Sequence, residues 1–353
     1  MDETEAWLTH WRRGRDFLPQ TFINPCPEVI ITHLCSIGLP CNGTFLQHRS
    51  LENRVYAYGL EGGGAIVVKL YRPGSWSRAA IAEEHLFLSE LRAAGLDVAC
   101  PLKAQDGSTI GEYAGILYAI FENIDGKSWL QEEHGVEDCR LLGRLLARIH
   151  KVGTQGQLRH RRPIKPHGLL KGSLRFLVEV DAIHPLVRND YMDLVQHLST
   201  LLVERCEHQQ TLRIHGDFGY WNMLWADDRP VVFDFDDMAM GIAAQDLALL
   251  MDSLDEQTVR LAERQGIDHS PFIEGYREIR SLDSQCAALL NPLLALRVVH
   301  INAWAASRIF DPAFQTKFSD FRSVDYWSRS MARMQQYLSR VEVYARRALR
   351  RKR

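Results

Sequence analysis

Three polar side chains between residues 214 and 237 have the spacing that a phosphoryl-transfer site requires. Asp217 and Asn222 stand five residues apart, and a short apolar run then ends at Asp234. A carboxylate such as Asp217 can orient and deprotonate an attacking hydroxyl, while Asn222 and Asp234 can hold Mg²⁺ on the phosphates of a nucleotide. The segment therefore predicts an ATP-dependent kinase with Asp217 as the catalytic residue and with Asn222 and Asp234 as metal ligands.

The same segment has the order of two protein-kinase motifs. Protein kinases have H-R-D-x-x-x-x-N followed by D-F-G; here residues 215–217 read H-G-D, Asn222 follows, and residues 234–236 read D-F-D. Apolar residues flank the first motif, and the run 230–233 has the composition of a buried strand that ends at Asp234. The alternative, acidic residues in solvated loops, does not require these elements in this order.

Composition restricts the class of protein. Apolar residues make up 46% and charged residues 24% of the 353 residues, and the net charge is -2, so we expect neither nucleic acid nor membrane as a partner. The seven cysteines form no C-x-x-C pair, which favours reduced thiols and a cytoplasmic location. The Arg-rich end, residues 346–353, is interpreted as a solvated helix end.

The rest of the chain must supply the elements that position this site. Residues 53–72 predict a hairpin and residues 116–121 a further strand. Helical periodicity marks the segments 27–39, 77–94, 137–152, 185–206, 243–264, 271–281 and 286–309. A strand-rich first part followed by a helical remainder predicts an α+β, bilobal fold, with an N-lobe at 1–122 (including an N-terminal helical extension) and a C-lobe at 123–353.

A nucleotide between the lobes needs a cation, and Lys69 is the candidate. It interrupts an apolar strand, where an unpaired lysine is costly to bury, although an edge strand would let it reach solvent. Glu83 and Glu84 on the following helix are possible partners, and Glu84 is preferred because it stands seven residues before the apolar Leu91.

Neither glycine-rich phosphate loop is present. The glycines at 62–64 lie between two strands and predict the hairpin turn. The segment 48–52, which includes Ser50, is therefore the candidate loop over the phosphates, although it lacks G-x-G-x-x-G. After Asp234 the chain is expected to enter a helix directly, without an activation loop, and Asp246 in that helix is a candidate acceptor of catalytic-loop amides or an acid favoured by the helix dipole.

These residues resemble the aminoglycoside phosphotransferase/choline kinase superfamily, and within it the bacterial stress response kinase A family of cytosolic Ser/Thr protein kinases. The resemblance covers roughly residues 20–330 and includes VVKLYRPGSW, LRIHGDFGYWNMLW and VVFDFDDMAMGIAAQDLALL. It implies a bilobal protein-kinase-like fold, ATP and Mg²⁺, and a protein acceptor with Ser or Thr; we also expect a monomer. By position it implies a catalytic Asp217 and the metal ligands Asn222 and Asp234, of which Asp234 is also an active-site residue. It further implies nucleotide contacts at Ser50, Lys69 and Glu84, and adenine contacts from the backbone at Glu122 to Ile124.

One departure concerns the acceptor. The family pattern has small or His residues between the Asp and the Asn, whereas residues 218–221 here read F-G-Y-W. A small-molecule kinase of the aminoglycoside, choline or sugar type is the alternative function, and acids such as Asp252, Asp255 and Glu256 would suit it. A pseudokinase that binds nucleotide only is disfavoured by the intact catalytic set.

Overall fold

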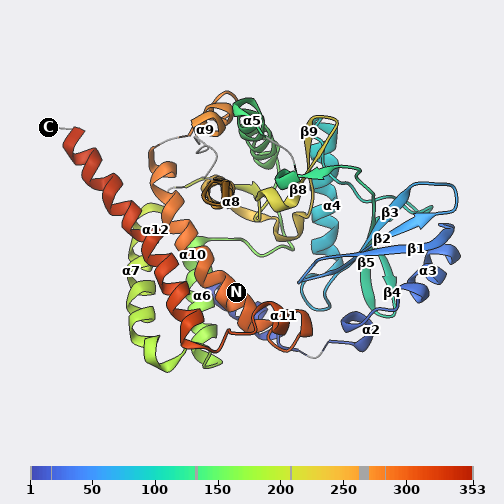
Figure 1. Cartoon of the computed structure of the whole chain (residues 1–353), viewed down its shortest axis with the longest axis horizontal. Coiled ribbons are helices and arrows are strands. Elements are labelled where there is room, and N and C mark those ends of the chain that lie inside the picture. The colour runs from blue at the N-terminus through green and yellow to red at the C-terminus, as the bar shows by residue number, and fades with distance from the viewer. Residues whose placement is uncertain are drawn as a thin grey trace.

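The computed structural model describes residues 2–16, 18–131, 134–206, 209–261, 270–282 and 284–351. Two regions considered above lie outside the described side chains, namely Asp255 with Glu256 and the Arg-rich residues 346–353. Figure 1 shows a sheet with a few helices on one side of the molecule and a larger, mainly helical part on the other. This arrangement confirms the expected α+β architecture.

The first part of the chain forms a five-stranded antiparallel sheet in the order β1-β2-β3-β5-β4. The strands are β1 (Cys41–His48), β2 (Arg54–Leu60), β3 (Ala65–Leu70), β4 (Gly111–Tyr113) and β5 (Ile116–Glu122). Residues 61–64 form the turn between β2 and β3, which confirms the hairpin and the non-phosphate reading of its glycines. Strand β1 was not predicted, because seven of its eight residues are exposed and it has no alternating pattern.

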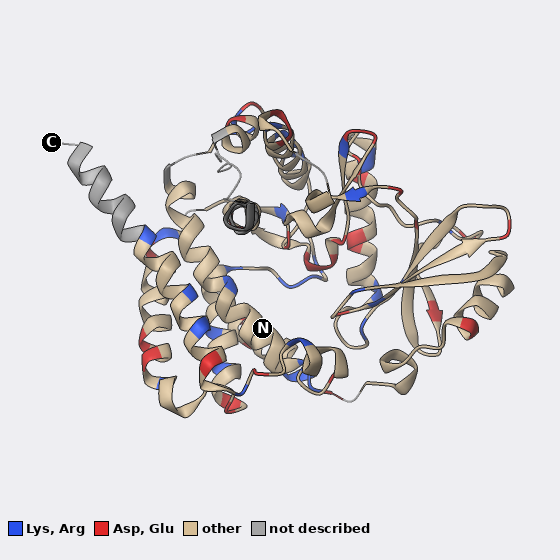
Figure 2. Ribbon diagram, viewed as in Figure 1, with Lys and Arg blue, Asp and Glu red and all other residues tan. Residues whose placement is uncertain are grey.

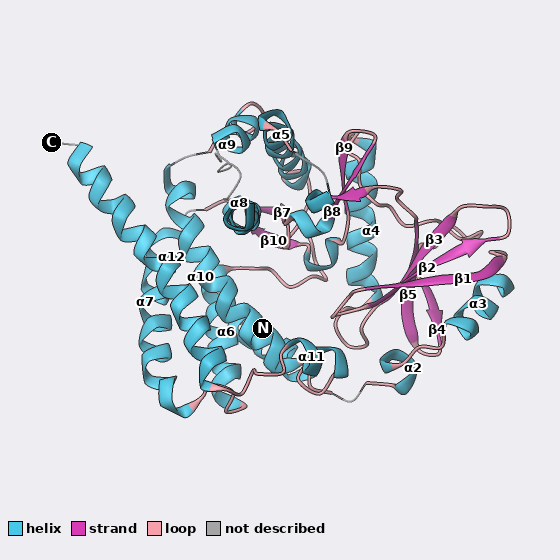
Figure 3. Ribbon diagram, in the orientation of Figure 1, coloured by secondary structure: helices cyan, strands magenta, loops and turns pink. Residues whose placement is uncertain are grey.

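Helices pack on both the sheet and its edges (Figure 3). They are α2 (Gln20–Ile23), α3 (Pro27–Ser36) and α4 (Arg78–Ala93). Ser77 begins α4 by accepting a hydrogen bond from the Ala80 amide, a standard N-terminal cap. A separate apolar core lies between α2, α3 and the sheet and contains Phe22, Leu34 and Tyr58. The sheet that carries Lys69 therefore shares an apolar core with α2 and α3.

The remainder of the chain is mainly helical, with two small sheets. Its helices are α5 (Val136–Gly153), α6 (Pro166–Glu179), α7 (Arg188–Cys206), α8 (Ala243–Leu261), α9 (Ser270–Arg277), α10 (Ser284–Ser307), α11 (Pro312–Lys317) and α12 (Val324–Arg351). Its strands are β6 (Lys127–Ser128), β7 (Thr211–Ile214), β8 (Met223–Ala226), β9 (Arg229–Val232) and β10 (Ala239–Ile242), paired as β6-β8-β9 and β10-β7. Short 3-10 turns occupy 129–131, 185–187, 220–222 and 235–237.

Two expectations about element placement need correction. The segment after Asp234 does not enter a helix directly, because residues 239–242 first form β10 and pair with β7; α8 begins only at Ala243. Helix α1 (Glu3–Arg13) packs on α6 and α10 instead of on the first sheet, so it contributes to the helical part although it precedes residue 122. The boundary at residue 122 otherwise stays a prediction.

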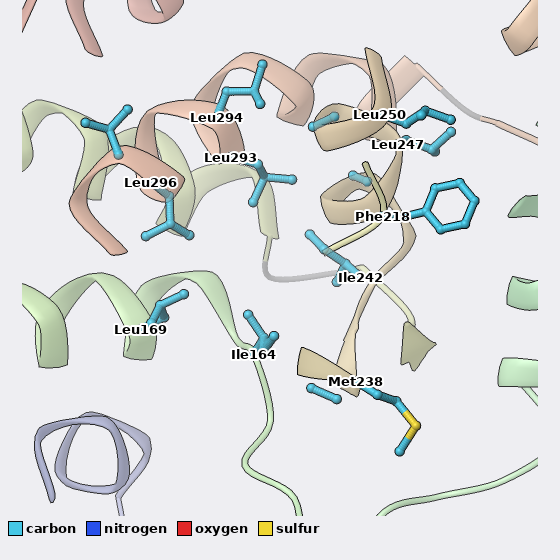
Figure 4. Packing of buried hydrophobic residues seen from close by; sticks show 14 of the residues in the cluster. Ile164, Leu169, Phe218, Met238, Ile242, Leu247, Leu250, Leu293, Leu294 and Leu296 are labelled. Carbon is cyan, nitrogen blue, oxygen red and sulfur yellow. The ribbon is translucent and has the colours of Figure 1, made fainter. Parts of the chain in front are cut away.

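The main hydrophobic core lies in the helical part and anchors the segment that carries Asp217. Phe218 is fully buried, and Figure 4 shows it beside α8 with Leu247 and Leu250. Among the described residues, one stretch of α10 is long and apolar enough to cross a membrane, judged by length and composition alone. This stretch is Gln285–Ser307, and 61% of its most apolar window is buried within the protein. Helix α10 therefore has a place in this core.

The sheet and the helical part are also joined by a buried ion cluster. Asp311, at the N-terminus of α11, accepts from Arg54 at 3.1 Å and from Arg72 at 2.7 Å. Asp311 and both arginines are nearly inaccessible to solvent. One carboxylate thus connects two strands' ends to the helix pair α10 and α11.

Candidate active site

A cavity of about 1100 Å³ lies between the first sheet and the helical part. All of the predicted site residues line it: Ser50, Lys69, Glu84, Glu122, Ile124, Asp217, Asn222 and Asp234. They come from the loop after β1, from β3, from α4, from the segment after β5, and from the loops around β8 and β9. The structure therefore brings the predicted residues together, while their individual roles remain predictions.

The loop that carries Asp217 is held by Asp246. The backbone amides of His215 and Gly216 donate to the Asp246 carboxylate at 2.8 and 2.9 Å, and His150 contacts it at 3.1 Å. These bonds confirm that Asp246 accepts catalytic-loop amides. Gly216 has φ +87°, and a Cβ there would lie 2.2 Å from the Asp237 carbonyl oxygen, so only glycine fits.

The Asp217 carboxylate has three side-chain partners. Arg297 on α10 donates to Oδ1 at 2.6 Å, whereas Trp221 and Asn222 donate to Oδ2 at 3.0 and 2.9 Å. Burial alone would raise the pKa of Asp217, but the Arg297 charge and the Trp221 hydrogen bond hold the pKa below its usual value. Asp217 is therefore ionised at neutral pH, as a group that attracts a hydroxyl proton must be.

The donors for a divalent cation are oxygen atoms on two adjacent loops. The side-chain amide nitrogen of Asn222 donates to Asp217, and the Oδ1 atom of Asn222 has no hydrogen-bond partner among the described residues. Asp234 has a half-exposed side chain and the left-handed backbone angles φ 59° and ψ 62°, a strained conformation for a non-glycine residue. No group of three or more His, Cys, Asp or Glu side chains in the described ranges could hold a metal alone. The pair fits Mg²⁺, which commonly binds one or two protein oxygens together with substrate phosphates and water.

Negative charge is crowded around these ligands. Desolvation within the cleft and the carboxylates of Asp217, Asp236 and Asp234 raise the pKa of Asp237, although this residue stays exposed to the cavity. Asp236 accepts from Asn53 at 3.0 Å and lies 3.2 Å from Lys69. A bound divalent cation would relieve this repulsion, so the charge distribution agrees with the donor set.

Lys69 points into this acidic region. Its ammonium lies 2.9 Å from Asp234, 3.2 Å from Asp236 and 3.9 Å from Glu84. Burial alone would lower the pKa of Lys69, but these carboxylates raise it well above its usual value. Lys69 is therefore a charged ammonium within the cavity, and its contact with phosphates stays a prediction.

Glu84, rather than Glu83, faces Lys69, as predicted. The partner nearest to Glu84 is nevertheless Arg161, at 2.6 Å, and both side chains are buried. Glu83 instead accepts backbone amides at 159–161. Burial raises the pKa of Glu84 in spite of the charges of Lys69 and Arg161. Glu84 is thus shared between the two cations.

Arg161 was not predicted and connects three parts of the site. Its guanidinium donates to Glu84 on α4 and to the carbonyl oxygens of Asp236 at 2.6 Å and Met238 at 3.1 Å. The only sequence signal is the basic run at 159–162, which predicts a solvated loop. Likewise Arg297 lies in an apolar helix 80 residues from Asp217, without a motif around it.

The remaining walls suit a nucleotide base. Val55 and Val67 from the sheet, and Leu224 and Phe233 from the helical part, line the cavity together with residues 121–124 and Gly126. Val67 and Lys69 stand two residues apart on β3 and so share a face of the strand. This places an apolar slot beside the predicted phosphate cation. Ser50 lies in the loop between β1 and β2, at the cavity wall.

The cleft between the lobes, with these carboxylate, amide and lysine groups, has the features of the active site of a bilobal phosphotransferase. The profile of the phosphotransferase enzyme family (APH) matches residues 44–282, and the chain belongs to that family. Among curated proteins it is 33% identical over 312 residues to serine/threonine protein kinase RdoA of Salmonella typhimurium (strain LT2), covering 88% of this chain and 91% of that protein. It is 31% identical over 314 residues to stress response kinase A of Escherichia coli (strain K12), covering 88% and 92%.

A solved structure supports the fold independently. Amicoumacin kinase hAmiN, in complex with AMP-PNP, Ca²⁺ and Ami, superposes with a TM-score of 0.66 at 19% identity and covers 85% of this chain and 92% of that one. The expected protein-kinase-like fold is thereby confirmed. Family membership and kinase relatives together confirm an ATP-dependent kinase.

Proposed function

We propose that this protein is an ATP-dependent Ser/Thr protein kinase of the stress-response type that uses Mg²⁺. The observation that carries the proposal is the meeting of Asp217, Asn222, Asp234 and Lys69 in one cavity. The protein acceptor is supported by the relatives at 31–33% identity over 88% of the chain, whose names describe stress-response and Ser/Thr kinases. A cytoplasmic, monomeric enzyme stays an expectation; the seven cysteines are free, in agreement with reduced thiols.

The mechanism is a direct in-line transfer of the ATP γ-phosphoryl group. Asp217 orients the acceptor hydroxyl and takes its proton, so that oxygen attacks phosphorus as the bond to the β-phosphate oxygen breaks. Mg²⁺, held by Asn222 and Asp234, would neutralise charge on the phosphates. Lys69 fixes the α- and β-phosphates, and the backbone at Glu122 to Ile124 binds adenine. Glu84 holds Lys69 in place.

The test is transfer of label from γ-labelled ATP with Mg²⁺ to a set of bacterial proteins, with Asp217→Asn as the matched variant. The variant is expected to keep its affinity for a fluorescent ATP analogue and to lose turnover by roughly three orders of magnitude or more. Near-normal turnover by Asp217→Asn would disprove the assignment of the base. Label that appears only on small molecules would exclude a protein kinase but leave the phosphotransferase intact.

A small-molecule kinase would be supported by acidic residues in the acceptor pocket, and Asp252 does not lie in the main cavity. Its carboxylate accepts from the Tyr337 hydroxyl at 2.8 Å, and it lines a smaller cavity on the far side of Trp221 and Arg297. The wall of the main cavity beyond Asp217 is instead contributed by α1 and α10 and carries histidine and arginine side chains. This wall disfavours cationic acceptors such as amino alcohols.

A further inference from the structure

The main cavity extends past Asp217 into a compartment that no predicted residue occupies. We call it the α1 compartment; its walls are Trp7, His10 and Trp11 of α1, His300 of α10, and Trp76 with Arg162 from two loops. The aromatic rings contact one another: His300 lies 5.3 Å from Trp11 and 5.7 Å from Trp7 between ring centroids. The compartment is therefore a built box of aromatic and imidazole rings.

Arg162 is the unusual group in this box. Its guanidinium lies over the rings of Trp76 at 4.3 Å and Trp7 at 5.4 Å, which fixes its plane. Its Nε is buried without a hydrogen-bond partner, and no carboxylate of the described residues forms an ion pair with it. The side chain as a whole is partly buried. A cation withdrawn from water in this way normally has a paired anion, because desolvating a charge is costly.

The neighbouring guanidinium groups, in contrast to that of Arg162, each have a carboxylate partner. Arg308 is paired with Glu52 at 2.8 Å, and Arg297 is paired with Asp217 at 2.6 Å. Asp237 and Glu52 are the acids whose fields reach Arg162, yet neither bonds to it. Burial, with the charges of Arg308 and Arg161, lowers the pKa of Arg162 to about 9, the direction expected for a cation without a partner.

The compartment lies on the acceptor side of the base. Arg297, His300 and Trp304 line the cavity from one face of α10, spaced as successive turns of a helix require, and Arg308 follows directly after the end of this helix. Arg297 holds Asp217, and His300 stands one turn further along the same face. Figure 2 shows Lys and Arg colouring on the loop that precedes α6, between the sheet and the helices. A molecule whose hydroxyl meets Asp217 can thus extend toward Arg162.

We propose that the α1 compartment is an acceptor subsite that binds an anionic group, a carboxylate or a phosphate, carried by the substrate near the hydroxyl that is phosphorylated. Arg162 supplies the charge and a planar fork of N–H donors that suits either oxyanion. The neutral imidazoles of His10 and His300 add hydrogen-bonding atoms. The inference rests on the proposed kinase activity and makes the substrate an acidic one: a Ser or Thr in an acidic protein segment, or a small hydroxy acid.

The first arm of the test compares two serine peptides that differ only in flanking Glu or Gln residues, with γ-labelled ATP. Wild-type protein is expected to use the Glu peptide with kcat/KM about tenfold or more above that for the Gln peptide. Arg162→Gln should remove this preference and leave KM for ATP within about twofold. Arg159→Gln, an exposed arginine of the same loop, is the matched control and should retain the preference.

The second arm separates this inference from the protein-kinase proposal. Label on glycerate or a free hydroxy amino acid, with the same dependence on Arg162, would retain the subsite and reject the protein acceptor. If no acceptor is labelled, sulfate titration in the presence of Mg²⁺ and ADP, followed by tryptophan fluorescence, tests the subsite alone. Equal sulfate affinity in wild type and Arg162→Gln, an equal use of both peptides, or a change confined to KM for ATP would overturn the proposal.

Discussion

Arg297 donates to Asp217 at 2.6 Å across 80 residues of chain, and this contact ties the catalytic loop to helix α10. The pair is only partly exposed, with 29% of the Arg297 side chain and 20% of the Asp217 side chain accessible. The arginine therefore acts on the candidate base by position and by charge. It also separates the main cavity from the smaller one on the other side of α10.

Replacing Arg297 by Gln should raise the pKa of Asp217, because the charge that opposes burial is removed. Asp217 would then lose its proton at higher pH, so the rising acid limb of kcat/KM should move to higher pH. The measurement is a pH–rate profile with saturating ATP. The control is Arg333→Gln, which removes an ion pair on the exposed face of α12. An acid limb at the same pH in Arg297→Gln would contradict this role.

Gly216→Ala should destabilise the catalytic loop. The residue must hold φ +87°, and its Cβ would lie 2.2 Å from the Asp237 carbonyl oxygen, so both backbone strain and a clash arise. We expect a loss of at least about 1–3 kcal/mol in the free energy of unfolding, and a large fall in turnover. Urea unfolding and the kinase assay measure both. Gly62→Ala, which meets nothing within 4 Å, should be nearly neutral, and equal effects of the two changes would refute the argument.

Arg161→Ala should damage both stability and nucleotide binding. The change would leave Lys69, 3.9 Å away, as the remaining cation near Glu84. It would also remove the hydrogen-bond donor of the Asp236 and Met238 carbonyl oxygens. Removing one partner of a buried ion pair costs about 3–5 kcal/mol. Chemical denaturation and the dissociation constant of an ATP analogue with Mg²⁺ are the readouts. A variant with unchanged affinity for the analogue would show that Arg161 does not position the metal-binding segment.

His85 predicts a dependence of stability on pH. Burial, helped by the charges of Lys69 and Arg161, lowers its pKa to about 3, and Tyr71 and Thr109 contact its two ring nitrogens. Between an unfolded-state pKa near 6.5 and the folded value, only the unfolded chain takes up the proton. The stability advantage of wild type over His85→Gln should therefore be full above pH 6.5 and shrink as pH falls toward 3, by about 1.4 kcal/mol per pH unit at most. Unfolding curves at pH 7, 6 and 5 measure this, and a constant difference would contradict it.

The local part of the site was predictable from sequence. Asp217, Asn222 and Asp234 lie within 18 residues, and their order is set by one loop and one hairpin. Lys69 was predictable because burying a lysine in an apolar strand is costly unless the lysine has an anionic partner. The hairpin, the helices α3, α4, α5, α7, α8, α9 and α10 and the α+β class follow from periodicity in the same way, whereas α6 was not predicted.

The contacts that complete the site were not predictable, because their partners are distant in the chain. Arg161 reaches Glu84 over 77 residues and Arg297 reaches Asp217 over 80, and neither arginine stands in a motif. Helix α1 was expected as a helical extension of the N-lobe, whereas Trp7, Leu8 and Trp11 are buried against α6 and α10. The exposed strand β1 lacks an apolar pattern because it lies at the sheet edge.

The position of Asp311 affects how cooperatively this protein unfolds. Its carboxylate binds Arg54 and Arg72 from the N-terminus of α11, so unfolding of the sheet alone or of the helices alone would leave a buried charge without its partner. Partial unfolding is for this reason the least favourable route. Although the chain has two lobes and separate apolar cores, heat or urea should convert it in one cooperative transition, as in a single domain.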